Sequence, residues 1–141
     1  MDAIIQKWKP YIDEKYVDTL HTFFNNAFMQ NNNDKMIIIK GDSGTGKTSF
    51  ITNMVDYIGK GHVSHINDMK MKDLIIVSEP SNLQFEPVVI QKINKLLDMK
   101  KSLVLICNNI IIPEELKSRV EIIKFGHYFL NNSCGLYFVQ R

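Results

Sequence analysis

Eight consecutive residues have the spacing of a polyphosphate-binding loop: Gly41-Asp42-Ser43-Gly44-Thr45-Gly46-Lys47-Thr48. They match the pattern G-x-x-x-x-G-K-[ST], in which a glycine-rich loop joins a strand to a helix. The glycines let the backbone curl so that its N–H groups face inward at the positive end of the helix, where an anion is stabilised. Lys47 is then placed to reach the β- and γ-phosphates of a nucleoside triphosphate, and the Thr48 hydroxyl to take one position on Mg²⁺. The pattern predicts a site for ATP and Mg²⁺, and the flanking residues disfavour the alternative of a turn that only joins two elements.

Three further residues adjoin buried apolar runs and could complete the chemistry of hydrolysis. Glu79 follows the run 74–77, Asn108 follows the run 103–107, and Arg119 precedes a further strand. The Glu79 carboxylate can polarise an attacking water, the Asn108 amide can hold that water or sense the γ-phosphate, and Arg119 can offset charge in the transition state. Singly, such an asparagine is more often a turn residue and such an arginine more often part of a surface ion pair. The prediction therefore depends on the order of all three.

A parallel sheet is needed to bring these residues together, and the hydrophobic pattern supplies its strands. Continuous apolar runs, typical of strands buried on both faces, occupy 36–39, 74–77 and 103–107. Two more strands are predicted over 63–66 and 120–125. Ligands on open parallel sheets gather at the carboxyl ends of the strands. With strand 74–77 beside the strand that precedes the loop, Glu79 would lie near the γ-phosphate.

Helical spacing of apolar residues predicts the elements that cover this sheet. A helix of one or two turns over 2–9 is interrupted by Pro10, and an amphipathic helix spans 12–28, with an aromatic stripe that we expect to face the core rather than stack on bases. The other predicted helices are 49–58, ending before Gly59, then 87 to about 100, and 114–119. We therefore expect one compact α/β domain of three layers, with an N-terminal helical cap over 1–34, a P-loop NTPase core over 35–126 and a tail over 127–141 that forms a hairpin.

Composition indicates a soluble intracellular protein, in the cytoplasm or a host nucleus. Its 45% hydrophobic and 23% charged residues are ordinary for a globular domain, and no apolar run approaches the length that spans a membrane. Cys107 and Cys134 fit thiols in a reducing compartment. With 17 basic and 15 acidic residues the net charge is only +2, so any nucleic-acid surface must be local. The candidates for it are Lys70, Lys72, Lys100 and Lys101, although lysines of this kind are more often simply solvated.

The motifs resemble those of the superfamily-three helicases, AAA+ type ATPases in the replication proteins of small DNA viruses. Gly41 to Thr48 resembles their Walker A motif, Leu74 to Glu79 their Walker B, Val104 to Asn108 their motif C, and Leu116 to Phe125, with Arg119, their arginine-finger segment. The resemblance covers about residues 35–125. It implies an AAA+ like fold and a homo-oligomeric ring, a hexamer, in which Arg119 completes the ATP site of a neighbour. It also implies that hydrolysis moves a nucleic-acid strand, single-stranded DNA, through the ring.

The chain also departs from that family, and other functions share its residues. The family usually ends Walker B with two acids, whereas Ser78 precedes Glu79 here, and it usually has a basic motif and a strand-engaging hairpin where this chain has one helix. An AAA+ helicase loader or a DNA-packaging ATPase would carry the same site. A small-molecule kinase usually has an arginine-rich lid, and the sequence offers only Arg119 and Arg141. A regulatory nucleotide-binding module that hydrolyses poorly because of Ser78 is a further alternative.

Overall fold

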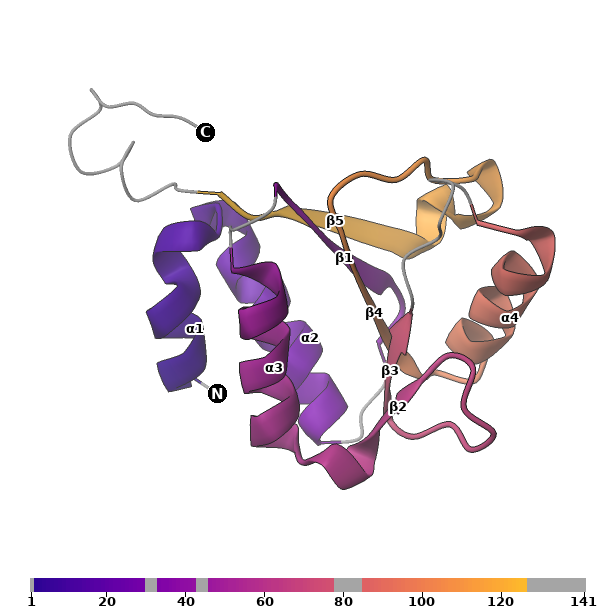
Figure 1. Cartoon of the computed structure of the whole chain (residues 1–141), viewed down its shortest axis with the longest axis horizontal. Coiled ribbons are helices and arrows are strands. Elements are labelled where there is room, and N and C mark those ends of the chain that lie inside the picture. Colours follow the sequence, from indigo (N-terminus) through magenta and orange to yellow (C-terminus); the bar gives the residue numbers. More distant parts are fainter. Residues whose placement is uncertain (1, 30–32, 43–45, 78–84, 127–141) are drawn as a thin grey trace.

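A five-stranded parallel sheet forms the centre of the molecule (Figure 1). The computed structural model describes residues 2–29, 33–42, 46–77 and 85–126. The strands are β1 (Met36–Lys40), β2 (Val63–His65), β3 (Leu74–Val77), β4 (Ser102–Cys107) and β5 (Val120–Lys124). Their order across the sheet is β2-β3-β4-β1-β5, so β2 and β5 form its edges.

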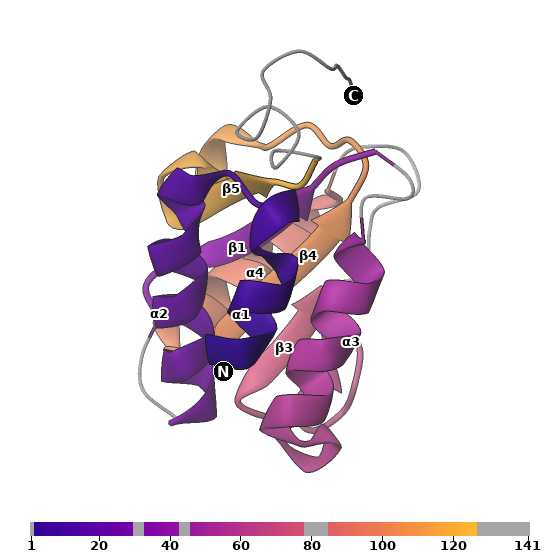
Figure 2. The same ribbon diagram turned by 90° about the vertical axis from the view of Figure 1, so that its left-hand side faces the viewer.

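Helices cover both faces of the sheet and make three layers (Figures 1 and 2). One face carries α1 (Asp2–Trp8), α2 (Val17–Phe28) and α3 (Lys47–Ile58), and the other carries α4 (Pro87–Asp98). Side chains of β1 alternate between the two interfaces: Ile37 and Ile39 join the cluster under α1 to α3, and Met36 and Ile38 join the cluster under α4. Both sides of the strand are therefore buried, which explains its unbroken apolar run. The predicted α/β fold, with a parallel sheet and an N-terminal helical cap, is confirmed.

The N-terminal segment differs from its prediction at one point. Pro10 lies in the 3-10 helix η1 (Lys9–Tyr11) directly after α1, so the predicted interruption is present. Helix α2 begins at Val17, because the Asp13 carboxylate accepts the Lys15 N–H at 3.3 Å and a separate 3-10 turn, η2 (Glu14–Tyr16), precedes it. Ile12 is extended and forms an antiparallel bridge with Phe125. The helix predicted over 12–28 is therefore wrong at its start, since a buried side chain at helical spacing can also come from an extended segment.

The other elements lie within a few residues of their predicted ranges. Helix α3 ends at Ile58, and Gly59 follows it with a φ of 102° that favours glycine. Segment 114–119 is a 3-10 helix, η4 (Glu114–Arg119), and a further one, η3 (Lys60–His62), precedes β2. Within the described ranges, none of the helices is long and apolar enough to cross a membrane. The tail over 127–141, with its predicted hairpin, lies outside the described residues.

The predicted placement of β3 beside β1 is wrong, because β4 lies between them. Leu105 of β4 is paired with Ile38 of β1 on one side and with Val77 of β3 on the other. Hydrophobic periodicity shows that a strand is buried, but it does not select the strand's neighbours. The carboxyl end of β3 is consequently two strand spacings, roughly 10 Å, from that of β1.

Candidate functional site

The carboxyl ends of β1 and β4 lie side by side at one end of the sheet, where the glycine-rich loop begins. Lys40 is paired with Cys107, and the Gly41 N–H donates to the Cys107 carbonyl at 3.2 Å. Asn108 directly follows Cys107, so the loop and the asparagine start from neighbouring strand ends. This is the edge at which open parallel sheets bind ligands.

Gly46 makes the turn from the loop into α3. Its φ of 87° lies in the left-handed region, which glycine adopts without steric cost. The Gly46 carbonyl accepts the Phe50 N–H at 2.9 Å, so Gly46 begins a 12-residue helix whose first members are Lys47 and Thr48. Backbone N–H groups in a first helical turn have no partner inside the helix, and the helix dipole adds positive potential there. The start of α3 therefore suits a phosphate group.

The Lys47 side chain is folded back into the loop. Its ammonium donates to the backbone carbonyls of Gly41 and Asp42, at 2.9 Å for Asp42, and to Oδ1 of Asn108 at 2.9 Å. Lys47 is only 7% exposed, and a buried ammonium requires such acceptors because its hydration is lost. The structure thus brings two of the predicted catalytic residues, Lys47 and Asn108, into contact.

The described residues fit a nucleotide bound with Mg²⁺. Thr48 directly follows Lys47 and is exposed in the first turn of α3. Mg²⁺ keeps several waters and takes few ligands from a protein, so a single hydroxyl is a sufficient anchor beside the phosphates. The remaining loop residues, Ser43, Gly44 and Thr45, lie outside the described residues, and so do Ser78 and Glu79.

Arg119 lies at the opposite end of the strands, where the parallel strands begin. It is the last residue of η4, and the next residue, Val120, is paired with Met36 at the start of β1. From Met36 to Lys40 the strand rises roughly 13 Å. Arg119 is therefore not brought to the loop of its own chain.

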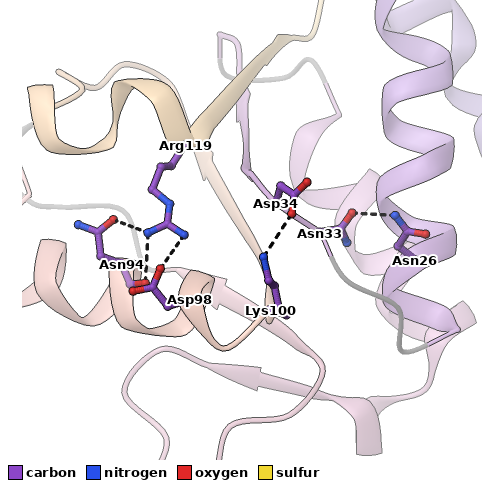
Figure 3. Close-up of polar contacts among 7 residues, drawn as sticks. All are labelled: Asn26, Asn33, Asp34, Asn94, Asp98, Lys100 and Arg119. Carbon is purple, nitrogen blue, oxygen red and sulfur yellow. Dashed lines mark hydrogen bonds and ion pairs between the residues drawn. The ribbon is translucent and has the colours of Figure 1, made fainter.

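Helix α4 holds the Arg119 guanidinium (Figure 3). Nη1 donates to Oδ1 of Asn94 at 3.2 Å and to the Asn94 carbonyl at 3.4 Å, and Nη2 lies 3.0 Å from Oδ1 of Asp98. The arginine side chain is 28% exposed and the Asp98 side chain 71%, so the ion pair is partly screened by water. These contacts attach η4 to α4 and give the guanidinium one defined orientation.

The lysines considered for strand contact lie away from the loop. Lys100 Nζ is 3.6 Å from Oδ1 of Asp34, in an exposed pair of the kind that contributes little stability (Figure 3). Lys70 and Lys72 are exposed before β3, and Lys101 directly precedes β4. The two groups of lysines therefore lie at the end of the sheet where β3 and β4 begin, opposite the phosphate loop.

A separate hollow of about 490 Å³ also lies at the amino edge, between α2 and the start of β1. Asp18, Asp34 and Glu121 contribute carboxylates to its lining, against the one ammonium of Lys35. Such a lining repels phosphate groups. The hollow is therefore not part of the predicted nucleotide site.

Trp8 is a neighbour of the loop that the sequence did not indicate. A β-carbon placed on Gly46 would lie 2.7 Å from Cζ3 of the Trp8 indole, a distance that real contacts do not reach. The contact joins the end of α1 to the start of α3, segments 38 residues apart in the chain. The helix predicted over 2–9 does not show which distant segment Trp8 meets.

Solved structures share this fold, although no protein-family model and no curated protein matches the sequence at a significant level. The chain is similar to PCH-2 of C. elegans, with a TM-score of 0.53 and 15% identity over 89% of this chain and 45% of that one. It is similar to a chain of the E. coli MS115-1 HORMA:CdnC:Trip13 complex, with a TM-score of 0.52 and 15% identity over 80% of this chain and 59% of that one. It is also similar to the A-form apo structure of the NrS-1 C-terminal region, with a TM-score of 0.64 and 14% identity over 98% of this chain and 40% of that one.

Identities of 14–15% show a common fold and no more. The chain also spans only 40–59% of the lengths of these structures. Together with the parallel sheet and the loop between β1 and α3, the likeness shows that the chain has an AAA+ ATPase-like fold with a P-loop NTPase-like core.

Proposed function

We propose that the chain is a Mg²⁺-dependent ATPase, the DNA helicase or translocase domain of a viral-type DNA replication protein. The observation that carries this proposal is the Lys47 ammonium, held at the start of α3 by loop carbonyls and by Asn108. A cation, helix-end N–H groups and an amide from the adjacent strand converge there, which are the donors that a polyphosphate needs. The AAA+ like fold and the superfamily-three resemblance of residues 35–125 support the same function.

Nucleotide binding exchanges the partners of Lys47. Its ammonium leaves the loop carbonyls for oxygens of the β- and γ-phosphates. The Thr48 hydroxyl would hold Mg²⁺ beside them, and the ion would supply further positive charge there. Asn108, released from Lys47, can then hold the attacking water or the γ-phosphate.

Hydrolysis follows by in-line displacement. Glu79 accepts a proton from a water whose oxygen attacks the γ-phosphorus, and the bond from that phosphorus to the ADP oxygen breaks. The products are ADP and inorganic phosphate. In the sequence, Ser78 stands before Glu79, so the segment after β3 brings one carboxylate where the family usually has two acids.

Arg119 serves the site of a neighbouring subunit in this proposal. Its place at the amino edge of the sheet keeps it from its own loop, whereas a ring of identical subunits can bring it to the next one. A hexamer that encircles single-stranded DNA is the assembly that the resemblance favours. The guanidinium would offset charge on the transferring phosphoryl group.

The primary test is Mg²⁺-dependent ATP binding and hydrolysis by the wild-type chain and by Lys47→Ala. The substitution should abolish binding or turnover, because the cation that meets the β- and γ-phosphates is lost, while circular dichroism stays unchanged. Lys60→Ala is the matched control, since it removes one exposed positive charge after the far end of α3. If the wild-type chain binds no nucleoside triphosphate in the presence of magnesium, the proposed function is wrong.

Unwinding of a tailed DNA duplex separates the helicase from its rivals. ATPase activity that DNA stimulates without strand separation would instead identify a helicase loader or a DNA-packaging ATPase. Transfer of the γ-phosphate to a nucleoside or nucleotide would identify a small-molecule kinase. A mass measurement in solution with ATP and DNA present gives the subunit count, and a monomer under those conditions would rule out the ring.

A further inference from the structure

The side chain of Trp8 contacts the point at which the phosphate loop becomes helix α3. On the indole, Cζ3 lies 2.7 Å, and Cε3 and Cη2 lie 3.4 Å, from the position that a β-carbon of Gly46 would take. These three atoms belong to the six-membered ring, so the benzo edge of the indole faces the glycine. No side chain fits between the ring and the loop, and Gly46 cannot move toward α1 unless the indole moves too.

The same ring also packs on the first turn of α3. The Phe50 ring lies edge-on to it, with centroids 6.4 Å apart and an interplanar angle of 84°, and the Phe50 N–H donates to the Gly46 carbonyl. Tyr11 packs on the indole at a centroid distance of 5.7 Å, and the Lys7 ammonium lies 5.4 Å from the ring centroid. Trp8 therefore packs against both residues, Gly46 and Phe50, that form the first hydrogen bond of the helix.

The position of the indole leaves one of its polar groups unsatisfied. Its Nε1–H is buried and has no hydrogen-bond partner, the only such side-chain atom in the described part of the chain. A buried unpaired donor is unfavourable, so the packing of the ring against Gly46, Phe50 and Tyr11 must outweigh it. Packing contacts therefore hold the ring in place, without a hydrogen bond from its Nε1–H.

We propose that Trp8 is a positioning residue of the nucleotide site, which fixes the backbone at Gly46 and couples the N-terminal helix α1 to the state of the phosphate loop. This inference rests on the proposed function. Lys47 and the first N–H groups of α3 extend directly from Gly46, so an indole that fixes this glycine prepares the donors before a phosphate arrives. Donors that are already ordered bind a ligand more tightly, because no further conformational entropy is lost when the ligand binds. When phosphate draws the Lys47 ammonium off the loop carbonyls, the surroundings of the indole beside Gly46 change as well.

The sequence has one tryptophan, so tryptophan fluorescence reports on the surroundings of Trp8. Titration of the full chain with Mg²⁺·ATP should change the emission of Trp8 saturably, with the same Kd that calorimetry gives. Mg²⁺ with inorganic tripolyphosphate should change the emission in the same direction, because the signal passes through the phosphate loop. A change with ATP and none with bound tripolyphosphate would place the nucleobase against Trp8 and overturn the proposal. Unchanged emission while calorimetry shows ATP binding would overturn it as well.

Affinity gives a second, independent measurement. Trp8→Phe keeps an aromatic ring for Tyr11 and Phe50 but lacks the benzo edge that meets Gly46, and we expect it to raise the Kd for Mg²⁺·ATP by about tenfold, the effect of 1.4 kcal/mol. Trp8→Ala should raise it at least as much. Tyr57→Ala is the matched control, because it truncates a 42% exposed aromatic residue near the far end of α3 and should leave the Kd unchanged.

The outcomes separate this inference from the proposed function. If the wild-type chain binds neither ATP nor tripolyphosphate, the proposed function fails and the inference fails with it. If the wild-type chain binds and Trp8→Phe binds equally well while only its melting temperature falls, Trp8 has a structural role and the inference alone is wrong. Should Trp8→Ala not fold, Trp8→Phe and the emission of the wild-type chain still decide the question.

Discussion

Replacing Asn108 with alanine should destabilise the free protein and yet favour nucleotide binding. Within the described residues, the substitution removes one of three acceptors of the Lys47 ammonium. A hydrogen bond to a charged group contributes about 1.5–3 kcal/mol when buried, but Asn108 is exposed and two carbonyls remain, so we expect a loss of about 1 kcal/mol. In a chain of this length that lowers the melting temperature by about 3 °C.

In the nucleotide complex the phosphates replace Asn108 as the partner of Lys47. The variant then has no Lys47 to Asn108 bond to break, so its Kd for Mg²⁺·ATP should fall by up to about fivefold, which is the same 1 kcal/mol. Turnover should decrease by about 10²–10³, the usual effect of removing one group that orders the transition state. Tighter binding, slower hydrolysis and a less stable free protein should therefore occur together.

Differential scanning fluorimetry, calorimetry and a phosphate-release assay measure these three quantities. Asn109→Ala is the matched control, because the neighbouring asparagine is equally exposed and should change none of them. Asn108→Asp supplies a charged acceptor that holds Lys47 and repels phosphate, so its affinity should fall instead of rising. Weaker nucleotide binding by Asn108→Ala at unchanged melting temperature would refute the partner exchange.

Three more predictions follow from the site and the fold. Glu79→Gln should bind Mg²⁺·ATP and stop hydrolysis in a phosphate-release assay, and normal turnover would mean that another group activates the water. Arg119→Ala should bind ATP yet hydrolyse it about 10³-fold more slowly. If the arginine acts across an interface, mixing this variant with Glu79→Gln subunits should partly restore activity. Mixed assemblies without restored activity would contradict this. Gly59→Ala should lower the free energy of unfolding by about 1–3 kcal/mol, because its φ of 102° is strained for other residues, whereas Gly61→Ala, with open space around it, should be nearly neutral in the same denaturant titration.

The strands were predictable because burial on both faces leaves a simple pattern. In β4 the run from Leu103 to Cys107 contains no polar residue, since alternate side chains enter the two clusters on opposite faces of the sheet. The helix after the loop was predictable for a related reason, because Phe50 and Met54 recur at helical spacing and are fully buried. Local patterns of this kind depend only on which side of an element meets the core.

Contacts between distant segments were less predictable. Any two parallel strands form the same hydrogen-bond ladder, so the position of β4 between β1 and β3 depends on how the whole sheet packs and not on a local pattern. The contact between Lys47 and Asn108 depends on that order, because it requires β4 to lie directly beside β1. Ile12 and Trp8 show the same limit: both lie in segments predicted to be helical, but their partners, Phe125 and Gly46, come from remote segments.

The contacts of Arg119 within its own subunit bear on its proposed role at a neighbouring site. A guanidinium has five N–H donors, and the contacts to Asn94 and Asp98 use three of them at Nη1 and Nη2. Nε–H and one Nη2–H make no hydrogen bond within the residues that the structure describes. Because α4 already fixes the side chain, a phosphate that meets these two donors does not have to order it, and the exposed carboxylate of Asp98 offsets only part of its charge. The ion pair on α4 is therefore compatible with the proposed action on a neighbouring site, and in such a ring it would fix the direction in which the guanidinium points.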